Sequence, residues 1–351
     1  MEEGPISRKE VAKRAGVSEA TVSRVLSGGG LVREATRRKV EEAAAQLGYV
    51  PNALAQRFAR RKSGNLGVIV PVVPKVRLFS TYYFSEILSG IGETAKLAGY
   101  DLLLMFLAPD EPRNYDLLFR TQKIDACIML GTQDTPEERT ALAGLQREGH
   151  AFCLVNQRFE GEAFPTVEAD HVQGSVAAVS HLIAQGCTKV AFLNGPISYS
   201  NSVDRLRGYQ QALQQHGLAP DPALQFSGNY SRTSGYANAK AIAGAIRDGR
   251  IDGVFAANDR MAIGLLQGLR EEQITPGQDV ALIGYDDSEG SQLTDPQLSS
   301  VAVPFYDLGA IAASRLLQSE GQQRASDERQ AVADKLEVQL VLRASTLMYR
   351  V

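Results

Sequence analysis

Apolar side chains recur three and four positions apart in the first 26 residues, a spacing that predicts two short helices. Ser7 and Glu10 form a capping-box pattern at the start of the first helix, and Gly16 can take the left-handed conformation that ends it. Ser18 is a candidate cap for the second helix. The side chains expected to point inward are Val11, Ala12, Ala15, Val22, Val25 and Leu26. Two helices joined by a tight turn favour a DNA-binding helix-turn-helix, with an ordinary helical hairpin as the alternative.

A third helix is expected over residues 34–47, where apolar side chains share one side and Gly48 ends the pattern. Arg33 precedes this segment and offers no oxygen acceptor for a cap, so we expect the helix to begin at Glu34 or to fray there. A short helical stretch is expected at 52–60, and a basic, exposed linker follows it.

From residue 66 onward, apolar runs alternate with amphipathic helices. Strands that are buried on both faces and alternate with helices predict an α/β fold of parallel sheets covered by helices. The segment is long for one such sheet, so we expect two similar lobes with a ligand cleft at the carboxyl ends of the strands. The expected strands are 66–73, 100–107, 124–130, 150–155, 189–195, 252–259 and 279–287, and the expected helices are 84–98, 136–148, 172–185, 202–216 and 260–272.

Charge separates the two parts of the chain more clearly than the net charge of −3 suggests. The first 65 residues carry 13 Lys and Arg against 7 Asp and Glu, whereas the remainder carries 24 against 33. A basic segment joined to an acidic body fits a nucleic-acid-binding module attached to a second function.

Several classes of protein are not indicated. No apolar run approaches the ~18 residues of a membrane span, and the N-terminus lacks the pattern of a secretory signal, so we expect a cytoplasmic protein without membrane contact. The three cysteines and four histidines lack metal-ligand spacing, so we expect no metal and no cofactor. An enzyme is not expected either, because no nucleophile elbow or phosphate loop is present.

The order of several motifs resembles the lactose-repressor/galactose-repressor family of transcription regulators over nearly the full length. The segments that carry this resemblance are VAKRAGVSEATVSRVL, TRRKVEEAAAQLGYVPNALAQ, FSEILSGI, DRLRGYQQAL, AANDRMAIGLL, IGYDD and LVLRAST. It implies a helix-turn-helix headpiece at 1–50, a hinge helix and linker at 51–65, and a two-lobed core at 66–351, similar to periplasmic binding proteins, that binds an effector and dimerises. The first lobe would comprise about 66–167 and 300–332, and the second about 168–299 and 333–351.

By this resemblance, Glu19 and Ala20 stand where the family reads bases, and Arg24 is a third reader suited to guanine O6 and N7. Glu19 can equally point to solvent. Phe58 stands where the hinge inserts a wedge into the minor groove, and the alternative is packing against the partner hinge or the core. The residues expected to contact DNA are Ser7, Ser18, Glu19, Ala20, Thr21, Ser23, Arg24, Thr36, Asn52, Ala55 and Phe58.

The candidate effector site draws on strand ends and on the resemblance. Asn258 and Asp286 are polar residues that follow buried strands, where a cleft is expected. The resemblance adds Arg205, which would bond effector hydroxyls, Tyr230 as an aromatic platform, and residues of the other lobe such as Asn156. The full set is Phe84, Asn156, Arg205, Tyr230, Asn258 and Asp286. Two neighbouring acids are expected to be structural: Asp259 as the cap of a helix beginning at Arg260, and Asp287 as a partner of a backbone turn.

Together these features predict a sequence-specific transcription regulator, a repressor of sugar-utilisation genes controlled by a small sugar-like effector. We expect it to bind a near-palindromic double-stranded operator as a homodimer. The direction of the effector response is open. The alternatives are a cytosolic sugar-binding protein and an architectural DNA-binding protein without operator specificity.

Overall fold

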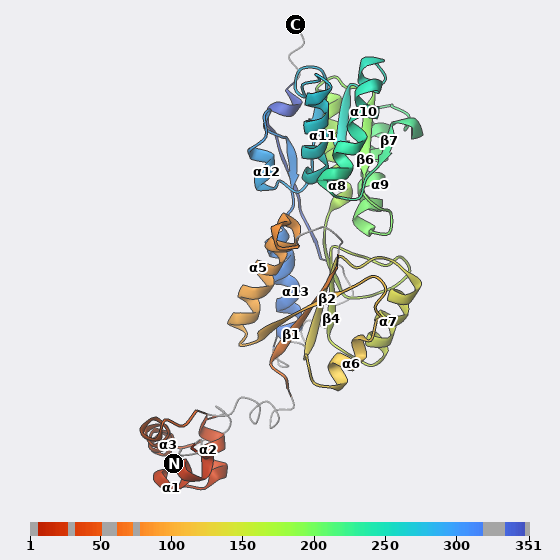
Figure 1. Ribbon diagram of the computed structural model, residues 1–351. Coiled ribbons are helices and arrows are strands. Elements are labelled where there is room, and N and C mark those ends of the chain that lie inside the picture. The colour runs from red at the N-terminus through yellow and green to blue at the C-terminus, as the bar shows by residue number, and fades with distance from the viewer. Residues whose placement is uncertain (1–5, 27–31, 51–61, 73–77, 319–333, 348–351) are drawn as a thin grey trace. The chain divides into compact units, whose positions relative to one another are not determined.

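The computed structural model describes residues 6–26, 32–50, 62–72, 78–318 and 334–347 (Figure 1). The chain forms two compact units, Met1–Gly64 and Asn65–Val351. The expected hinge helix, with Asn52, Ala55 and Phe58, lies outside the described residues. None of the helices in the described part of the chain is long and apolar enough to span a membrane.

The first unit packs three helices, α1 (Arg8–Ala15), α2 (Glu19–Leu26) and α3 (Glu34–Leu47), around a small core. The capping box is present, because the Glu10 carboxylate accepts hydrogen bonds from the Ser7 backbone N–H at 2.7 Å and from its hydroxyl at 2.8 Å. Gly16 ends α1 with φ 67°, as expected. Helix α3 begins at Glu34 without a side-chain cap from Arg33. The buried side chains are Val11, Ala12, Val22, Val25, Val40, Ala43 and Ala44.

The first lobe of the second unit is built on a six-stranded parallel sheet in the order β11-β5-β4-β3-β1-β2. Helices α5 (Tyr82–Leu97) and α13 (Phe305–Leu317) pack together on one face, and α6 (Tyr115–Arg120) and α7 (Pro136–Arg147) cover the other (Figure 1). The strands are β1 (Asn65–Pro71), β2 (Asp101–Leu107), β3 (Ala126–Leu130), β4 (Phe152–Val155), β5 (Thr166–Ala169) and β11 (Asp334–Leu336).

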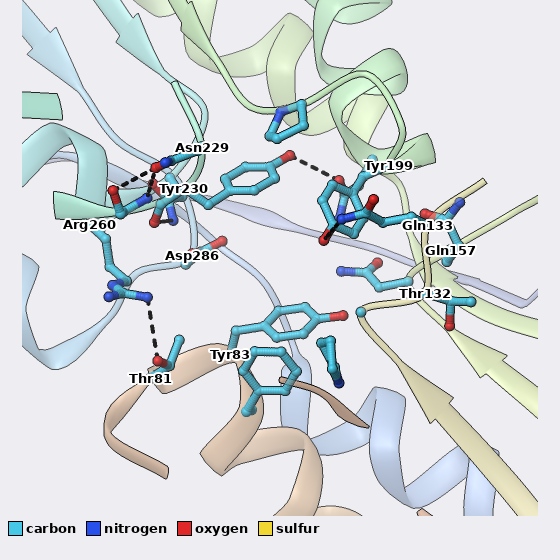
Figure 2. Close-up of a pocket in the computed structure, with 18 of the residues that line it drawn as sticks. Thr81, Tyr83, Thr132, Gln133, Gln157, Tyr199, Asn229, Tyr230, Arg260 and Asp286 are labelled. Carbon is cyan, nitrogen blue, oxygen red and sulfur yellow. Dashed lines mark hydrogen bonds between the residues drawn. The ribbon is translucent and has the colours of Figure 1, made fainter. Parts of the chain in front are cut away.

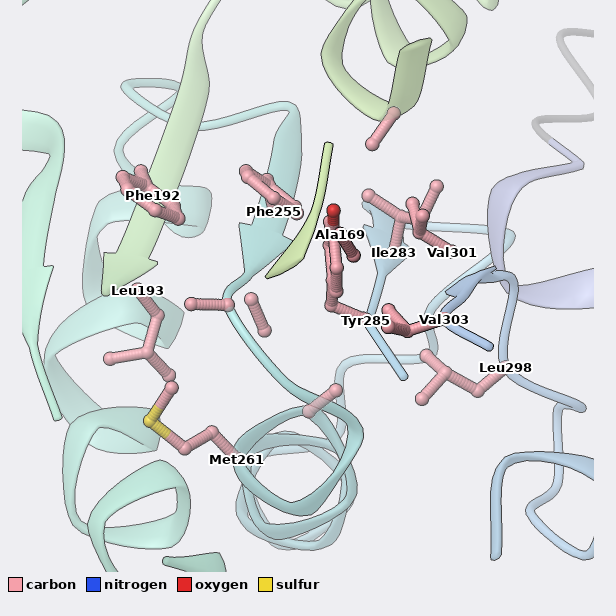
Figure 3. Packing of buried hydrophobic residues seen from close by; sticks show 14 of the residues in the cluster. Ala169, Phe192, Leu193, Phe255, Met261, Ile283, Tyr285, Leu298, Val301 and Val303 are labelled. Atoms are coloured by element: carbon pink, nitrogen blue, oxygen red, sulfur yellow. The ribbon is translucent and has the colours of Figure 1, made fainter. Parts of the chain in front are cut away.

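The second lobe contains a four-stranded parallel sheet in the order β7-β6-β8-β9. Its strands are β6 (Val190–Asn194), β7 (Gln225–Ser227), β8 (Gly253–Ala256) and β9 (Ala281–Ile283). Its helices are α8 (His171–Ala184), α9 (Ser200–Gln215), α10 (Arg232–Arg247), α11 (Asp259–Glu271) and α12 (Glu289–Gln292). Its core includes the stacked rings of Phe192 and Phe255, whose centroids lie 4.8 Å apart (Figure 3).

The chain passes between the lobes at slightly different residues from those expected. Strands β5 and β11 both belong to the first sheet, so the crossings follow residues 169 and 336, a few residues beyond 167 and 332. Strand β10 (Ser300–Ala302) pairs antiparallel with β12 (Gln339–Val341) in a separate two-stranded sheet. Short 3-10 turns complete the unit at η1 (Leu78–Ser80), η2 (Pro222–Leu224) and η3 (Ala344–Thr346).

Candidate functional site

A pocket of about 360 Å³ lies between the two lobes of the second unit. Strand ends and helix starts of both lobes form its wall, as expected for the carboxyl edge of parallel sheets. Tyr83 and Tyr230 enter it from opposite sides, with Asp286 between them (Figure 2). The structure brings all six residues of the expected effector set to this one pocket: Phe84, Asn156, Arg205, Tyr230, Asn258 and Asp286.

Arg205 and Asp286 form the charged centre of the pocket. Arg205 comes from α9, is 3% exposed, and places Nη2 3.8 Å from Asp286 Oδ1. Its guanidinium lies over the ring of Tyr285, 4.2 Å from the centroid. Burial raises the pKa of Asp286 well above its usual value, and Arg205 opposes that rise. A buried acceptor beside a buried donor can bind neighbouring hydroxyl groups of one ligand.

Tyr230 precedes α10 and lies in the wall of the pocket. Its hydroxyl donates to Asn201 Oδ1 at 3.0 Å, contacts the Ser202 hydroxyl, and accepts from Arg205 Nη1 at 3.4 Å. The backbone of Tyr230 is left-handed, with φ 65°, and its ring packs edge-on against Tyr199. These hydrogen bonds hold an aromatic plate whose free face can stack on a ligand.

Asn156 follows β4 in the first lobe and is 2% exposed. Its Oδ1 accepts from His171 Nε2 at 2.7 Å and from the Ala169 backbone N–H at 3.3 Å, whereas its amide Nδ2 has no partner in the part of the chain that the structure describes. Burial lowers the pKa of His171 well below its usual value, and Arg205 adds to the effect. Asn156 therefore lines the pocket with a donor whose hydrogen-bonding capacity the described residues leave unused.

Asn258 performs the capping role that was expected of Asp259, and that expectation was wrong. Helix α11 begins at Asp259, and Asn258 Oδ1 accepts from the Met261 backbone N–H at 2.9 Å. The amide Nδ2 of Asn258 donates to the Tyr230 carbonyl at 3.1 Å. Both polar ends of Asn258 are thus already bonded within the protein, although the residue lines the pocket.

Asp259 is instead completely buried below the pocket. Its Oδ2 accepts from the Ser288 backbone N–H at 2.7 Å, and its Oδ1 accepts from the Ser300 hydroxyl at 2.6 Å. Burial raises the pKa of Asp259 to about 7. Asp287 is structural, as expected, and is not among the residues that line the pocket, but its Oδ1 pairs with Arg343 Nη2 at 2.7 Å rather than with a backbone turn.

Several lining residues were absent from the expected set. The segment 74–84 was recognisably rich in aromatic residues, and Tyr82 and Tyr83 of its described part line the pocket beside Phe84. Among the side-chain hydrogen bonds that cross between the lobes here, Gln133 Nε2 donates to the Tyr199 hydroxyl at 2.9 Å, and Arg260 Nη1 donates to Thr81 Oγ1 at 3.4 Å (Figure 2). No local sequence signal marked Gln133 or Arg260.

In the first unit, α2 presents a polar outer side. Val22 and Val25 are buried, whereas Glu19, Ala20 and Arg24 are exposed. Ser18 and Thr21 share a hydrogen bond of 2.9 Å, and Glu19 Oε2 lies 3.8 Å from Arg8 Nε. The other described candidates for DNA contact, Ser7, Ser23 and Thr36, are exposed or half-buried. A short helix with this outer side fits the dimensions of a major groove.

Comparison with known proteins matches both units. "Bacterial regulatory proteins, lacI family" matches residues 8–52, and a periplasmic binding protein-like domain matches residues 179–346. The Escherichia coli K12 regulator AscG is 34% identical over 301 residues, covering 85% of this chain and 87% of AscG. The E. coli K12 repressor CytR is 30% identical over 351 residues, covering 98% and 97%.

Two solved structures have the same fold over almost the whole chain. The operator-bound Lac repressor dimer with the anti-inducer ONPF has a TM-score of 0.81 and 27% identity, covering 98% of this chain and 99% of that chain. The complex of the transcriptional regulator CelR with cellobiose has a TM-score of 0.70 and 28% identity, covering 97% and 99%.

Proposed function

Since this chain belongs to the LacI family of bacterial regulatory proteins, we propose that it represses sugar-utilisation genes under the control of a sugar-like effector. It is a DNA-binding transcription regulator with a helix-turn-helix and a periplasmic-binding-protein-like core. The observation that carries the effector proposal is the convergence of six chemically suited side chains, from both lobes, on one pocket of about 360 Å³.

The chemistry of the pocket favours a polyhydroxylated ligand. Arg205 and Asp286 supply a donor and an acceptor less than 4 Å apart, which matches a pair of adjacent hydroxyls. Tyr230 and Tyr83 provide aromatic faces on opposite sides, suited to the apolar faces of a sugar ring (Figure 2). Support for a sugar also comes from relatives, because the CelR structure is named as a cellobiose complex.

The response to the effector would arise from movement between the lobes. A ligand that bridges them competes with or strengthens contacts such as Gln133–Tyr199 and Arg260–Thr81. A further interlobe connection is the partly buried ion pair in which Arg158 Nη2 lies 2.9 Å from Asp204 Oδ1. Biasing such a two-state arrangement typically changes DNA affinity by about 1–3 kcal/mol.

For DNA recognition we propose that α2 enters the major groove and that Arg24 bonds guanine, worth roughly 1–3 kcal/mol of discrimination. Glu19 and Ala20 would face neighbouring bases, and the remaining polar candidates would contact phosphates. One such helix reads few bases, so a two-fold dimer on a near-palindromic operator is part of the proposal.

Exposed apolar side chains in the first lobe support a homodimer. Leu97 at the end of α5 is 83% exposed, and Phe79, Leu102 and Phe106 beside and on the edge strand β2 are 41–63% exposed. Single exposed apolar residues are common, but a group along one helix and one sheet edge is typical of an interface. Size-exclusion chromatography with light scattering tests this part directly.

The experiment that tests the function begins with selection of bound duplexes from a random-sequence pool by the purified full chain. We expect one near-palindromic sequence to bind at least ~10³-fold more tightly than a scrambled duplex at the same salt concentration. Fluorescence anisotropy of that operator is then measured with each member of a sugar panel, and we expect one member to change the affinity. Equal binding to all duplexes would indicate an architectural protein, and conversion of the sugar to a product would indicate an enzyme.

A further inference from the structure

Arg260 is a charged residue of the pocket wall that has no role in the proposed binding of ligand hydroxyls by Arg205 and Asp286. It is the second residue of α11, contributed by the second lobe, and its side chain reaches across to Thr81 at the start of α5 (Figure 2). This one hydrogen bond is 3.4 Å long, whereas a guanidinium carries five donors. In the described part of the chain, no carboxylate lies at ion-pair distance from Arg260.

The described lining of the pocket carries excess positive charge. Its charged members are Arg205, Arg260 and Asp286. Asp286 lies closest to Arg205, with 3.8 Å between the charged atoms, so that pair is balanced if the carboxyl is ionised. If burial keeps the carboxyl protonated, both arginines are uncompensated. Burial lowers the pKa of Arg260 and the charge of Asp286 opposes that shift, but among the described residues no carboxylate lies close enough to form an ion pair with Arg260.

The pocket also has more unmet donors than acceptors. Asn156 Nδ2 and Arg205 Nε are buried nitrogen atoms that find no hydrogen-bond partner among the described residues, and both belong to lining residues that are at least 97% buried. Leaving such donors unpaired is costly, because the protein interior offers them no water. A ligand with a negatively charged, oxygen-rich group would compensate the Arg260 guanidinium and match the excess of donors around the pocket.

We propose that Arg260 binds an anionic group of the effector, so that the pocket selects a sugar acid or a sugar phosphate over the corresponding neutral sugar. This inference rests on the proposed function and names the ligand class for the same pocket. Arg205 and Asp286 bind hydroxyls, and Arg260, on the opposite lobe from Tyr83, holds the carboxylate or phosphate in place of its weak bond to Thr81. Bidentate pairing of a guanidinium with either group gives short, strong hydrogen bonds.

The test uses matched neutral and anionic sugars with the full-length protein. The sets are D-glucose, D-glucuronate and D-glucose 6-phosphate; D-galactose and D-galacturonate; and D-ribose and D-ribose 5-phosphate. Isothermal titration calorimetry at constant ionic strength gives the dissociation constants. We expect at least one anionic sugar to bind about tenfold or more tightly than its neutral partner, a difference of ~1.4 kcal/mol. Comparison of the uronates with the phosphates identifies which anionic group is bound.

Variants then assign the preference to Arg260. Arg260→Gln should remove the preference for the anion while leaving the affinity for the neutral sugar within about twofold. Arg260→Lys keeps the charge but loses the bidentate geometry, so it should retain only part of the preference. Arg120→Gln is the matched control, since Arg120 is an exposed arginine of α6 outside the pocket. An unchanged far-UV circular dichroism spectrum and urea midpoint verify that Arg260→Gln is folded.

The outcomes separate this inference from the proposed function. Equal or tighter binding of the neutral sugars, or an anion preference that survives Arg260→Gln, would overturn the role of Arg260 and leave a sugar-controlled regulator intact. If no member of the sets binds, the sugar-effector proposal fails, and the inference fails with it.

Discussion

Replacing Asn258 separates a structural role from a ligand-binding role at one position. Asn258→Ala removes the cap of α11 and the hydrogen bond from Nδ2 to the Tyr230 carbonyl. Asn258→Ser keeps an oxygen acceptor for the cap but removes the donor. Since an N-cap contributes about 1 kcal/mol and a neutral hydrogen bond about 1 kcal/mol, we expect losses of ~2 kcal/mol for Ala and ~1 kcal/mol for Ser.

The assay is urea denaturation of the full chain, monitored by far-UV circular dichroism, with and without the effector. The free energy of unfolding measured without ligand gives the structural contribution of Asn258. If Asn258 also binds the effector, Asn258→Ser should reduce the affinity for the effector by more than the loss of stability accounts for. The reason is that Nδ2, which this variant lacks, would donate a second hydrogen bond to the bound effector. Full stability of Asn258→Ala would refute the capping argument. Normal effector affinity of Asn258→Ser would remove Asn258 from the ligand contacts.

Three further predictions concern the pocket, the DNA-binding helix and the buried acid. Asp286→Ala should abolish the effect of the effector on operator affinity while retaining operator binding. Asp116→Ala, in α6 and outside the pocket, is the control, and a normal response of Asp286→Ala would exclude Asp286 from the site. Arg24→Ala should reduce the preference for the operator over other duplexes by about tenfold or more. The variant should still bind any duplex in a salt-dependent way, as measured by anisotropy. The free energy of unfolding should decrease as pH rises from about 4 to 7, because burial raises the pKa of Asp259 to about 7 and the native state then holds more protons than the unfolded state. Asp259→Asn should flatten this dependence in urea titrations, and an unchanged slope would contradict the shift.

Local sequence signals were sufficient for the elements whose ends are set by nearby residues. The capping box at Ser7, the left-handed Gly16 and the start of α3 at Glu34 all follow from contacts within a few positions. The strands β6 and β8 were equally predictable, because buried parallel strands consist of continuous apolar runs.

Four of the described helices, α6, α10, α12 and α13, were not predicted, and the reason in α10 is its small residues. A side chain at Gly235 would place Cβ 2.0 Å from the Met261 carbonyl oxygen, and one at Gly264 would place it 1.9 Å from the Arg232 carbonyl oxygen. These glycines allow α10 and α11 to approach closely, but glycine weakens the helix signal in isolation. Packing between distant segments therefore decides a helix that local propensity leaves undetermined.

The sequence by itself determined the alternation of strands and helices, the helix-turn-helix, and the polar residues that follow strands, since each depends on neighbours along the chain. Tertiary structure alone decided whether Asn258 or Asp259 caps α11. Ser288 and Ser300 hydrogen-bond to Asp259 below the pocket, so Asn258 caps the helix. It also decided that Arg260 lines the pocket with no carboxylate of the described residues at ion-pair distance. Charge balance in a pocket depends on residues that are far apart in sequence and are brought together by folding.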